Sequence, residues 1–291
     1  MIIVNMMGGL GNQMFQYAAG RRLAHHHNTD LFLDVTGFAY DVLRKYELDI
    51  FRINAAIANK NLLKRVPPYS RKDFFRLGIG YLFLGETKIE SKKEQTLDFD
   101  DQILSLPDNI YLDGYWQNEK YFADISDILK KDFTFVNSPS TINKEILEEI
   151  GGCNSVSVHI RRGDYVSNPK TMEIHGVLGI DYYIQALNLI EKKVKDPQVF
   201  VFSDDMPWMK DNLKTDLSLH FMEHNGLEKN YEDLRLMSNC KHHIIANSSF
   251  SWWGAWLSNN QNKLVIAPNK WFFDKKMNSE QKIVPHNWIK I

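Results

Sequence analysis

The stretch SVSVHIRRGDYV, residues 155–166, decides the fold that we expect for the second half of the chain. In an extended strand the side chains alternate between the two faces, so the two valines and the isoleucine share one face, whereas His159 and Arg161 share the other. Arg162 then turns away, to where Asp164 could pair with it. Tandem arginines at the end of a buried strand are costly without an anionic partner. The pattern therefore predicts a buried strand that leads into an anion-binding site, and the alternative is that both arginines only form salt bridges at the surface.

Strands and helices alternate along the chain after this stretch. Such an order is typical of a parallel sheet that is covered by helices on both faces. The second half is therefore predicted to be a Rossmann-type α/β domain. The elements expected in it are a helix at 181–194, strands at 199–203 and 219–222, a helix at 230–240, a strand at 242–247, a helix at 250–259 and a strand at 264–267.

The first half of the chain opens with a unit of the same kind. A short apolar strand, a glycine loop and a helix are expected at 2–7, 8–11 and 12–27. We therefore expect an α/β protein of two domains, with residues 1–145 in the first and 146–291 in the second.

The composition limits the possible functions. Lys plus Arg (35) nearly balances Asp plus Glu (36) in the 291 residues, which argues against broad attraction to nucleic acid or to an anionic membrane. No apolar run approaches the length of about 18 residues that spans a membrane, and no signal peptide is recognisable, so we expect a cytoplasmic protein with Cys153 and Cys240 as free thiols. The basic stretch at 60–76 is interpreted as a solvated face, with peripheral contact to a membrane that carries a lipid-linked acceptor as the alternative.

Polar residues follow two further strands of the second half, at the ends where parallel sheets bind their ligands. The carboxylate of Asp204, beside Ser203, could accept hydrogen bonds from the N1–H and N2–H groups of guanine, although helix capping is the alternative. Ser248 and Ser249 stand where a strand ends and a helix begins, so hydroxyls, backbone N–H groups and the helix dipole converge there. This position is predicted to bind an anion, although either serine could serve only as a cap.

The glycine loop at 8–13 suits the close approach of a phosphate to the backbone. It is not the dinucleotide-binding fingerprint, because Met14 occupies the third glycine position. No metal site is expected, because the acid pair at Asp98 and Asp100 lies in a polar loop and the histidines at 25–27 lie at a helix end. If no metal neutralises a diphosphate, arginines must do so.

Four segments together resemble the bacterial α-1,2-fucosyltransferases, which transfer fucose from GDP-fucose to a galactoside. The segments are GGLGNQMFQYA, HIRRGDY, VFSDD and IIANSSFSWWGAWL, and their order and spacing span nearly the whole chain. The resemblance implies a GT-B architecture of two Rossmann-like domains facing a cleft, with the acceptor on the N-terminal side and the GDP-sugar on the C-terminal side. It also implies inversion at the anomeric carbon of fucose and no requirement for a metal ion.

The same resemblance assigns roles to individual residues. His159 would contact guanine or ribose, Arg161 the β-phosphate and Asp204 the nucleoside, with Arg162 and Asp164 as structural support. The substrate-binding residues that it implies are Gly9, Gly11, Asn12, Gln13, His159, Arg161, Ser203, Asp204, Ser248, Ser249 and Phe250.

The base that removes the proton from the acceptor hydroxyl is expected in the loop at 168–179. Glu173 and His175 are the candidates there, and they complete the catalytic set with Arg161. Glu173 is favoured because related fucosyltransferases place a glutamate in the corresponding loop, and Asp164 is the alternative.

Two other classes of function are compatible with parts of the sequence. A carbohydrate- or nucleotide-binding protein without catalysis would explain the seven tryptophans but would not need paired anion sites. A nucleic-acid-binding protein would explain the tandem arginines, but the chain has no long basic stripe. The partners that the resemblance implies are GDP-fucose and a galactose-terminated oligosaccharide, and no nucleic acid is expected as a partner.

Overall fold

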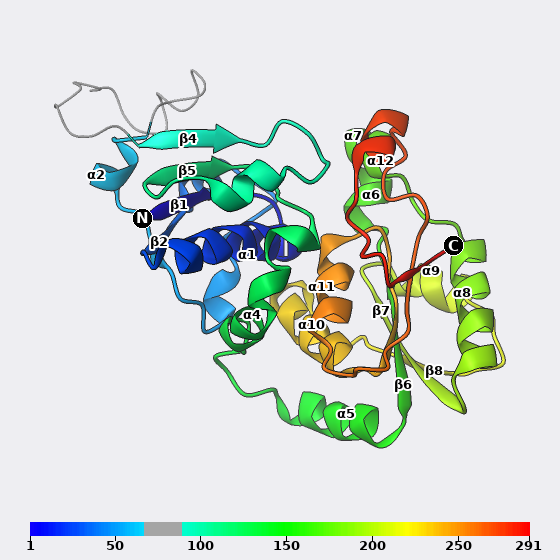
Figure 1. Ribbon diagram of the computed structural model, residues 1–291. Helices are drawn as coiled ribbons and strands as arrows, with labels where there is room; N and C mark the ends of the chain where they lie inside the picture. The colour runs from blue at the N-terminus through cyan, green and yellow to red at the C-terminus, as the bar shows by residue number, and fades with distance from the viewer. Residues whose placement is uncertain (67–88) are drawn as a thin grey trace. The chain divides into compact units, whose positions relative to one another are not determined.

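Each half of the chain folds around a parallel β-sheet, so the predicted α/β class is confirmed (Figure 1). The computed structural model describes residues 1–66 and 89–291. These residues divide into two units, Met1–Val136 and Asn137–Ile291, called unit 1 and unit 2 below. All the strand pairs of the two sheets are parallel.

The sheet of unit 1 has the order β3-β2-β1-β5-β4 in the described residues. The apolar strand β1 lies at its centre, and the predicted helix α1 follows β1 after the glycine loop. The strands are β1 (Ile2–Asn5), β2 (Leu31–Asp34), β3 (Ala56–Ile57), β4 (Glu90–Lys93) and β5 (Ile110–Asp113). The α-helices are α1 (Leu10–His27), α2 (Lys60–Leu63) and α4 (Ser126–Asp132), and short 3₁₀ turns lie at Thr36–Ala39, Leu48–Ile50, Asp101–Ser105, Glu119–Tyr121 and Ala123–Ile125.

The sheet of unit 2 has the order β11-β10-β9-β6-β7-β8. Its strands are β6 (Asn154–Ile160), β7 (Pro197–Ser203), β8 (Ser218–Phe221), β9 (His242–Ile244), β10 (Val265–Ala267) and β11 (Ile289–Lys290). Its α-helices are α5 (Thr141–Gly152), α6 (Gly163–Ser167), α7 (Pro169–His175), α8 (Ile180–Lys193), α9 (Met206–Asn212), α10 (Asn230–Asn239), α11 (Ser249–Leu257) and α12 (Lys275–Glu280), with a 3₁₀ turn at Leu227–Lys229.

The alternation predicted for the central strand β6 is confirmed. The side chains of Val156, Val158 and Ile160 pack into one apolar core with α8 and α9. On the opposite face, the hydroxyl of Ser157 lies 2.8 Å from Nδ1 of the buried His243, and the ring of His159 lies 5.6 Å from that of Phe250 in α11. Helices α8 and α9 therefore lie on one side of β6 and β7, with α10 and α11 on the other (Figure 1).

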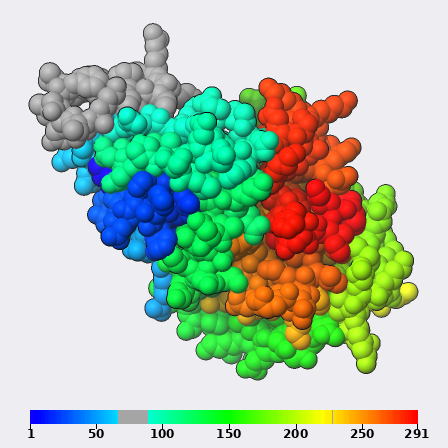
Figure 2. Space-filling model, in the orientation of Figure 1, coloured from blue at the N-terminus to red at the C-terminus, as the bar shows by residue number. Residues whose placement is uncertain are grey.

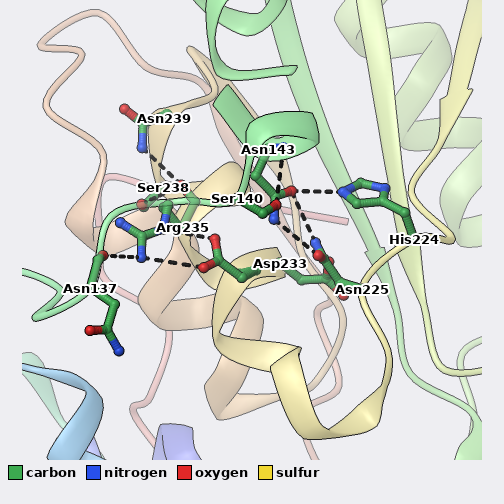
Figure 3. Close-up of polar contacts among 10 residues, drawn as sticks. Asn137, Ser140, Asn143, His224, Asn225, Asp233, Arg235, Ser238 and Asn239 are labelled. Atoms are coloured by element: carbon green, nitrogen blue, oxygen red, sulfur yellow. Dashed lines mark hydrogen bonds and ion pairs between the residues drawn. The ribbon is translucent and has the colours of Figure 1, made fainter. Parts of the chain in front are cut away.

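The division between the units comes earlier than the expected one after residue 145, which would cut α5. Figure 3 shows why α5 belongs to unit 2. Asn143 of α5 donates a 3.0 Å hydrogen bond to Asn225, and its own Oδ1 lies 2.7 Å from Nε2 of His224. The buried Arg235 of α10 also donates to the carbonyl of Asn137 at 2.8 Å. These contacts attach the segment from residue 137 onward to α10 and to the residues that follow β8.

Three smaller expectations have different outcomes. Cys153 and Cys240 are free thiols, as predicted. Most of the basic stretch at 60–76 lies outside the described residues, because the description stops at 66. Within the described ranges, no helix is both long and apolar enough to cross a membrane.

Candidate active site

The carboxyl ends of β9, β6 and β7 form the candidate active site in unit 2. These three strands are neighbours in the sheet and run parallel, so the residues that follow them reach the same edge. Each strand is followed by polar residues, as the sequence predicted. The site therefore collects the segments 161–164, 203–205 and 247–250.

Arg161 lies between two carboxylates at this edge. Its Nη2 donates to Asp164 Oδ1 at 2.6 Å, and its Nη1 lies 2.9 Å from Asp204 Oδ2 in an ion pair whose angle is poor for a hydrogen bond. Burial would lower the pKa of Arg161, but Asp204 and Asp164 raise it above its usual value. The guanidinium also lies 5.7 Å from the ring centre of Tyr165. Arg161 is thus charged and fixed in place, with a quarter of its side chain exposed.

Arg162 points to different partners, which corrects the expected pairing. Its Nε donates to Asp205 Oδ2 at 2.9 Å, and its guanidinium carbon lies 3.7 Å above the ring of Trp208. Asp164 therefore pairs with Arg161 and not with Arg162. The backbone N–H of Arg162 donates to Asp204 Oδ1 at 2.8 Å, so Asp204 holds both arginines.

Gly163 allows α6 to start directly beside Asp204. A Cβ atom at position 163 would lie 2.5 Å from Asp204 Oδ2, closer than real Cβ contacts. That carboxylate cannot give way easily, because the N–H of Arg162 and the guanidinium of Arg161 hold it. Any larger residue at 163 would therefore displace either the helix or the ion pair.

The side chains of Ser203 and Asp205 have local structural partners. Ser203 Oγ accepts a 3.0 Å hydrogen bond from the N–H of Asp205, and Asp205 Oδ1 accepts from Trp208 N at 3.3 Å as the cap of α9. The capping alternative considered for this cluster therefore applies to Asp205. It does not apply to Asp204, whose partners are the arginines.

His159 is a buried, neutral group behind Arg161. Burial lowers its pKa to about 4, although Asp204 acts to raise it and Arg161 to lower it further. Its Nδ1 atom is buried and has no hydrogen-bond partner among the described residues. A neutral imidazole can either donate or accept a hydrogen bond to a ligand.

Ser248 and Ser249 lie at the start of α11, as predicted. The first turn of a helix leaves backbone N–H groups without intrahelical partners. In α11 the first backbone hydrogen bond of the helix runs from the N–H of Trp252 to the carbonyl of Ser248, at 3.0 Å. The Ser248 side chain makes no capping hydrogen bond to this helix. The hydroxyl therefore does not serve as a cap, and the helix start keeps the character of an anion site. The tryptophans of α11 are buried core residues, as expected.

The segment that carries the candidate bases is helical, whereas the sequence indicated a loop. Asn168 caps α7 by accepting from the N–H groups of Lys170 and Thr171, and Pro169 occupies the first turn. Glu173 is exposed on α7. His175 is half-buried: its ring stacks on Tyr165 at 4.9 Å and 18°, its Nδ1 has no partner among the described residues, and burial lowers its pKa.

The glycine loop of unit 1 has the shape expected for a strand–loop–helix turn. Gly8 has a positive φ of 75°, and a Cβ there would lie 2.6 Å from Nδ2 of Asn12. Gly9 caps α1 and Gly11 is buried. Asn12 Oδ1 accepts a 2.7 Å hydrogen bond from Gln117.

Gln13 has a supporting position instead of the substrate-binding position expected. Its side chain is fully buried, and its Nε2 donates to the carbonyls of Gly8 at 2.9 Å and Lys45 at 2.8 Å. Its Oε1 accepts from Glu47 N at 2.9 Å. All of its donors are therefore used to hold the glycine loop against the chain at 45–47.

The acidic residues that the sequence weighed as metal ligands have other partners. Asp100 caps the turn at Asp101–Ser105 and lies 3.1 Å from Lys92 Nζ, and Asp98 accepts from Phe99 N. In residues 1–66 and 89–291, no three His, Cys, Asp or Glu side chains are grouped closely enough to hold a metal ion.

Three residues of the site were not predicted from the sequence. Tyr165 lies within the arginine segment, beneath Arg161. Trp208 stacks on Arg162, and Asn247 precedes the serine pair. An aromatic residue shortly after the end of each of two strands, one of which carries the arginines, is a usable signal, because guanidinium groups stack on aromatic rings.

A model of glycosyl transferase family 11 matches residues 1–291. An α-1,2-colitosyltransferase of Escherichia coli is 36% identical over 301 residues, covering 100% of this chain and 98% of the relative. A galactoside α-(1,2)-fucosyltransferase 2 of Sus scrofa is 23% identical over 267 residues, covering 89% of this chain and 70% of the relative.

A solved structure shares the fold at low sequence identity. It is the crystal structure of the NodZ α-1,6-fucosyltransferase soaked with GDP-fucose, and NodZ is a fucosyltransferase from Bradyrhizobium. The TM-score is 0.52 at 12% identity, and the match covers 88% of this chain and 92% of the NodZ chain. The GT-B type predicted from the sequence and the resemblance to fucosyltransferases are both confirmed.

Proposed function

The chain belongs to glycosyl transferase family 11, and on that premise we propose that it moves L-fucose from GDP-fucose to the 2-hydroxyl of a terminal galactoside, with inversion and without a metal ion. The observation that carries the proposal is that Arg161 and the start of α11 follow the carboxyl ends of two neighbouring parallel strands, β6 and β9. Two carboxylates fix the guanidinium of Arg161, and a pair of serines stands at the start of α11. Together, the guanidinium and the helix start are suited to bind a diphosphate.

The charge that develops on the leaving group determines the roles of the residues in unit 2. As the bond from the anomeric carbon to the β-phosphate oxygen breaks, negative charge grows on that phosphate. Arg161 opposes this charge, and a preorganised donor of this kind is worth about 3 to 4 kcal/mol in the transition state. Two carboxylates already offset the charge of Arg161, so the N–H groups and hydroxyls at 248–250 share the stabilisation.

The nucleoside would lie beside His159 and Asp204. A buried imidazole with an unused Nδ1 can form a hydrogen bond to ribose or to the base without bringing a charge. Asp204 would give up part of its pairing with the arginines to accept from guanine. In unit 1, Gly9, Gly11 and Asn12 are the residues that we propose to bind substrate.

Glu173 is the proposed base that accepts the proton of the acceptor hydroxyl. It is exposed on α7, so its carboxylate is available to a sugar. Glu173→Gln keeps the shape and removes the basicity, and it should lower kcat by about 10²- to 10⁴-fold while GDP affinity stays near wild type.

The matched control is Glu148→Gln, which changes an exposed glutamate of α5 in the same unit. It should leave kcat unchanged. If His175→Ala costs far more activity than Glu173→Gln, and the glutamine variant keeps the acidic limb of its pH profile, then His175 or Asp164 is the base.

Independence from metal ions is a further part of the proposal. The positive groups and helix N–H groups of unit 2 are expected to neutralise the diphosphate themselves. Transfer should therefore continue in excess EDTA, measured by product formation after gel filtration of the enzyme. Loss of most activity, restored by Mn²⁺ or Mg²⁺, would contradict this expectation.

The identity of the donor sugar has one specific competitor. The 36% identical relative is described as a colitosyltransferase, so a donor that carries colitose is the second candidate. Product analysis with GDP-fucose and with a GDP-linked colitose donor, each offered with a panel of galactosides, separates the two. Turnover of GDP-fucose into an α-1,2-linked product is the expected result. Binding of GDP without any product would favour the non-catalytic alternative.

A further inference from the structure

We propose that Asn247 is a positioning residue, which fixes α6 and the end of α7 against the residues that bind the diphosphate. It precedes Ser248 directly and is itself almost completely buried, with 1% of its surface exposed. The inference rests on the proposed function, because the chemical use of these segments comes from it. The contacts themselves lie entirely within unit 2.

Asn247 joins three segments of the chain. Its Nδ2 donates to the carbonyl of His175 at 2.8 Å and to the carbonyl of Trp271 at 3.1 Å. Its own backbone carbonyl accepts a 3.1 Å hydrogen bond from the hydroxyl of Tyr165. One residue thus holds α6, the end of α7 and the segment after β10 at the carboxyl end of β9.

The three segments also contact one another around Asn247. The His175 ring stacks on Tyr165 and lies 5.3 Å from the ring of Phe272. The N–H of Phe273 donates to the carbonyl of Ile174 at 2.8 Å. Beyond this cluster the residues from Phe273 to Lys276 are exposed, on the orange-red surface of unit 2 in Figure 2. Asn247 is therefore the inner anchor of a segment whose outer side is solvated.

The geometry requires an asparagine. Two backbone carbonyls need two donors from one planar group, and the amide Nδ2 has two N–H bonds. An aspartate would place an acceptor against both carbonyls, and a serine could serve only one of them. Alanine would leave both carbonyls without their donor. A buried acceptor has also lost its hydrogen bonds to water, so the substitution should lower the free energy of unfolding.

The position of Asn247 links it to the chemistry. Tyr165, which Asn247 holds, lies 5.7 Å from the Arg161 guanidinium. Glu173 lies on α7, and the carbonyl of the last residue of that helix accepts a hydrogen bond from Asn247. A shift of α6 and α7 relative to Ser248 would thus move the candidate base and the support of Arg161 together. A misplacement of about 1 Å can cost about 10²-fold in rate.

Asn247→Ala and Asn247→Ser test the proposal, with Asn260→Ala as the matched control. Asn260 also donates from Nδ2 to a backbone carbonyl, that of Lys241 at 2.8 Å, but this contact lies at the amino end of β9. Hydrogen exchange followed by mass spectrometry is measured on the free proteins, because it needs no substrate. Asn247→Ala should speed exchange in 163–176 and 271–274 but not in β6 and β7.

Kinetics then separate positioning from general damage. Asn247→Ala should lower kcat by about 10²-fold while the Kd for GDP changes less than about threefold, because the diphosphate residues themselves remain. Asn247→Ser should recover part of the loss. Asn260→Ala should leave kcat and the exchange of both segments at wild-type values. If Asn247→Ala does not fold, Tyr165→Phe, which removes only one hydrogen bond, should show the same exchange pattern at smaller amplitude.

Unchanged exchange at 163–176 and 271–274 in a folded Asn247→Ala protein would overturn the proposal. So would an equal loss of GDP affinity and kcat, which would make Asn247 part of the diphosphate site itself. Failure of the wild-type protein to form any fucosylated product would instead refute the proposed function, and the exchange result would still decide the role of Asn247.

Discussion

The glycine loop of unit 1 and the carboxyl edge of β6 in unit 2 are similar in outline but use their side chains differently. Both are turns between a parallel strand and a helix, and both were expected to contact the diphosphate. In the glycine loop, the amide of Gln13 forms three hydrogen bonds to the backbone of its own unit. At the edge of β6, the charged side chain of Arg161 is held by other side chains and remains partly exposed.

The difference shows how a sequence motif can mix binding residues with scaffold residues. A backbone that must approach a phosphate closely needs glycines, and such a loop then needs an internal support. Gln13 provides that support from inside the motif. At β6 only Asp164 supports Arg161 from within the motif, and the other carboxylates that hold the two arginines, Asp204 and Asp205, follow β7.

Among substitutions in these two turns, Arg161→Lys should cause the largest loss of activity. A lysine keeps the charge but cannot reproduce the two directions in which the guanidinium donates, to Asp164 and towards Asp204. We expect kcat to fall by about 10²- to 10³-fold, the range found when one preorganised donor is removed. The measurement is activity per folded molecule, with the folded fraction taken from a melting curve.

Arg162→Lys is the matched comparison, because its neighbouring guanidinium contacts Asp205 and Trp208 instead. It should lower the melting temperature, while kcat per folded molecule should stay closer to the wild-type value than in Arg161→Lys. If Arg161→Lys lowers the melting temperature but leaves the activity per folded molecule unchanged, the roles of the two arginines are reversed.

The arginine pair also shows how far the sequence could predict the site. Alternation correctly placed the valines of β6 in the core and His159 on the opposite face, because a strand has a period of two. The rule fails after Ile160, where β6 ends and Arg162 adopts φ −133° and ψ −53°. Asp164 therefore meets Arg161, and no period within the sequence could predict that.

The predicted elements are those with a clear period, and the missed ones have weak or mixed patterns. Helix α8 and strand β7 were expected nearly where they lie, because their apolar residues repeat regularly. Helix α7 was interpreted as a loop, since Pro169 and Gly176 usually interrupt structure. Pro169 instead occupies the first turn of the helix, and Gly176 ends it with a positive φ of 61°. Strand β4 has the polar sequence ESKK and lies at the sheet edge, so hydrophobicity could not reveal it.

Gln13→Ala should affect stability more than binding. The substitution leaves the carbonyls of Gly8 and Lys45 and the N–H of Glu47 without their side-chain partner. With about 1 kcal/mol for each lost hydrogen bond, we expect the free energy of unfolding in urea to fall by about 3 kcal/mol. Activity per folded molecule should change little.

Gln95→Ala is the control for this prediction, because Gln95 is exposed and donates only to the carbonyl of Lys93. Its cost should stay within about 0.5 kcal/mol. A Gln13→Ala protein of normal stability and greatly reduced GDP affinity would show instead that Gln13 contacts the ligand, and the contrast between the two turns would disappear.

The smallest expected effect is a pH dependence of stability that comes from His159. Burial lowers the pKa of His159 to about 4 in the folded protein, below the value near 6.5 of a solvated histidine. Between these values the unfolded chain binds a proton that the folded chain does not, so stability must fall as the pH falls. A single group of this kind should lower the free energy of unfolding by about 1 kcal/mol between pH 7 and pH 5.5.

Other histidines with lowered pKa values, including His175 and His243, contribute with the same sign. The test is therefore the difference between wild type and His159→Gln in urea unfolding across this pH range. The variant should show a shallower decline by about that amount. If the free energy of unfolding falls equally with pH in both proteins, Asp204 keeps the pKa of His159 at an ordinary value in the folded protein. The edge of β6 would then be more open to water than the burial of His159 indicates.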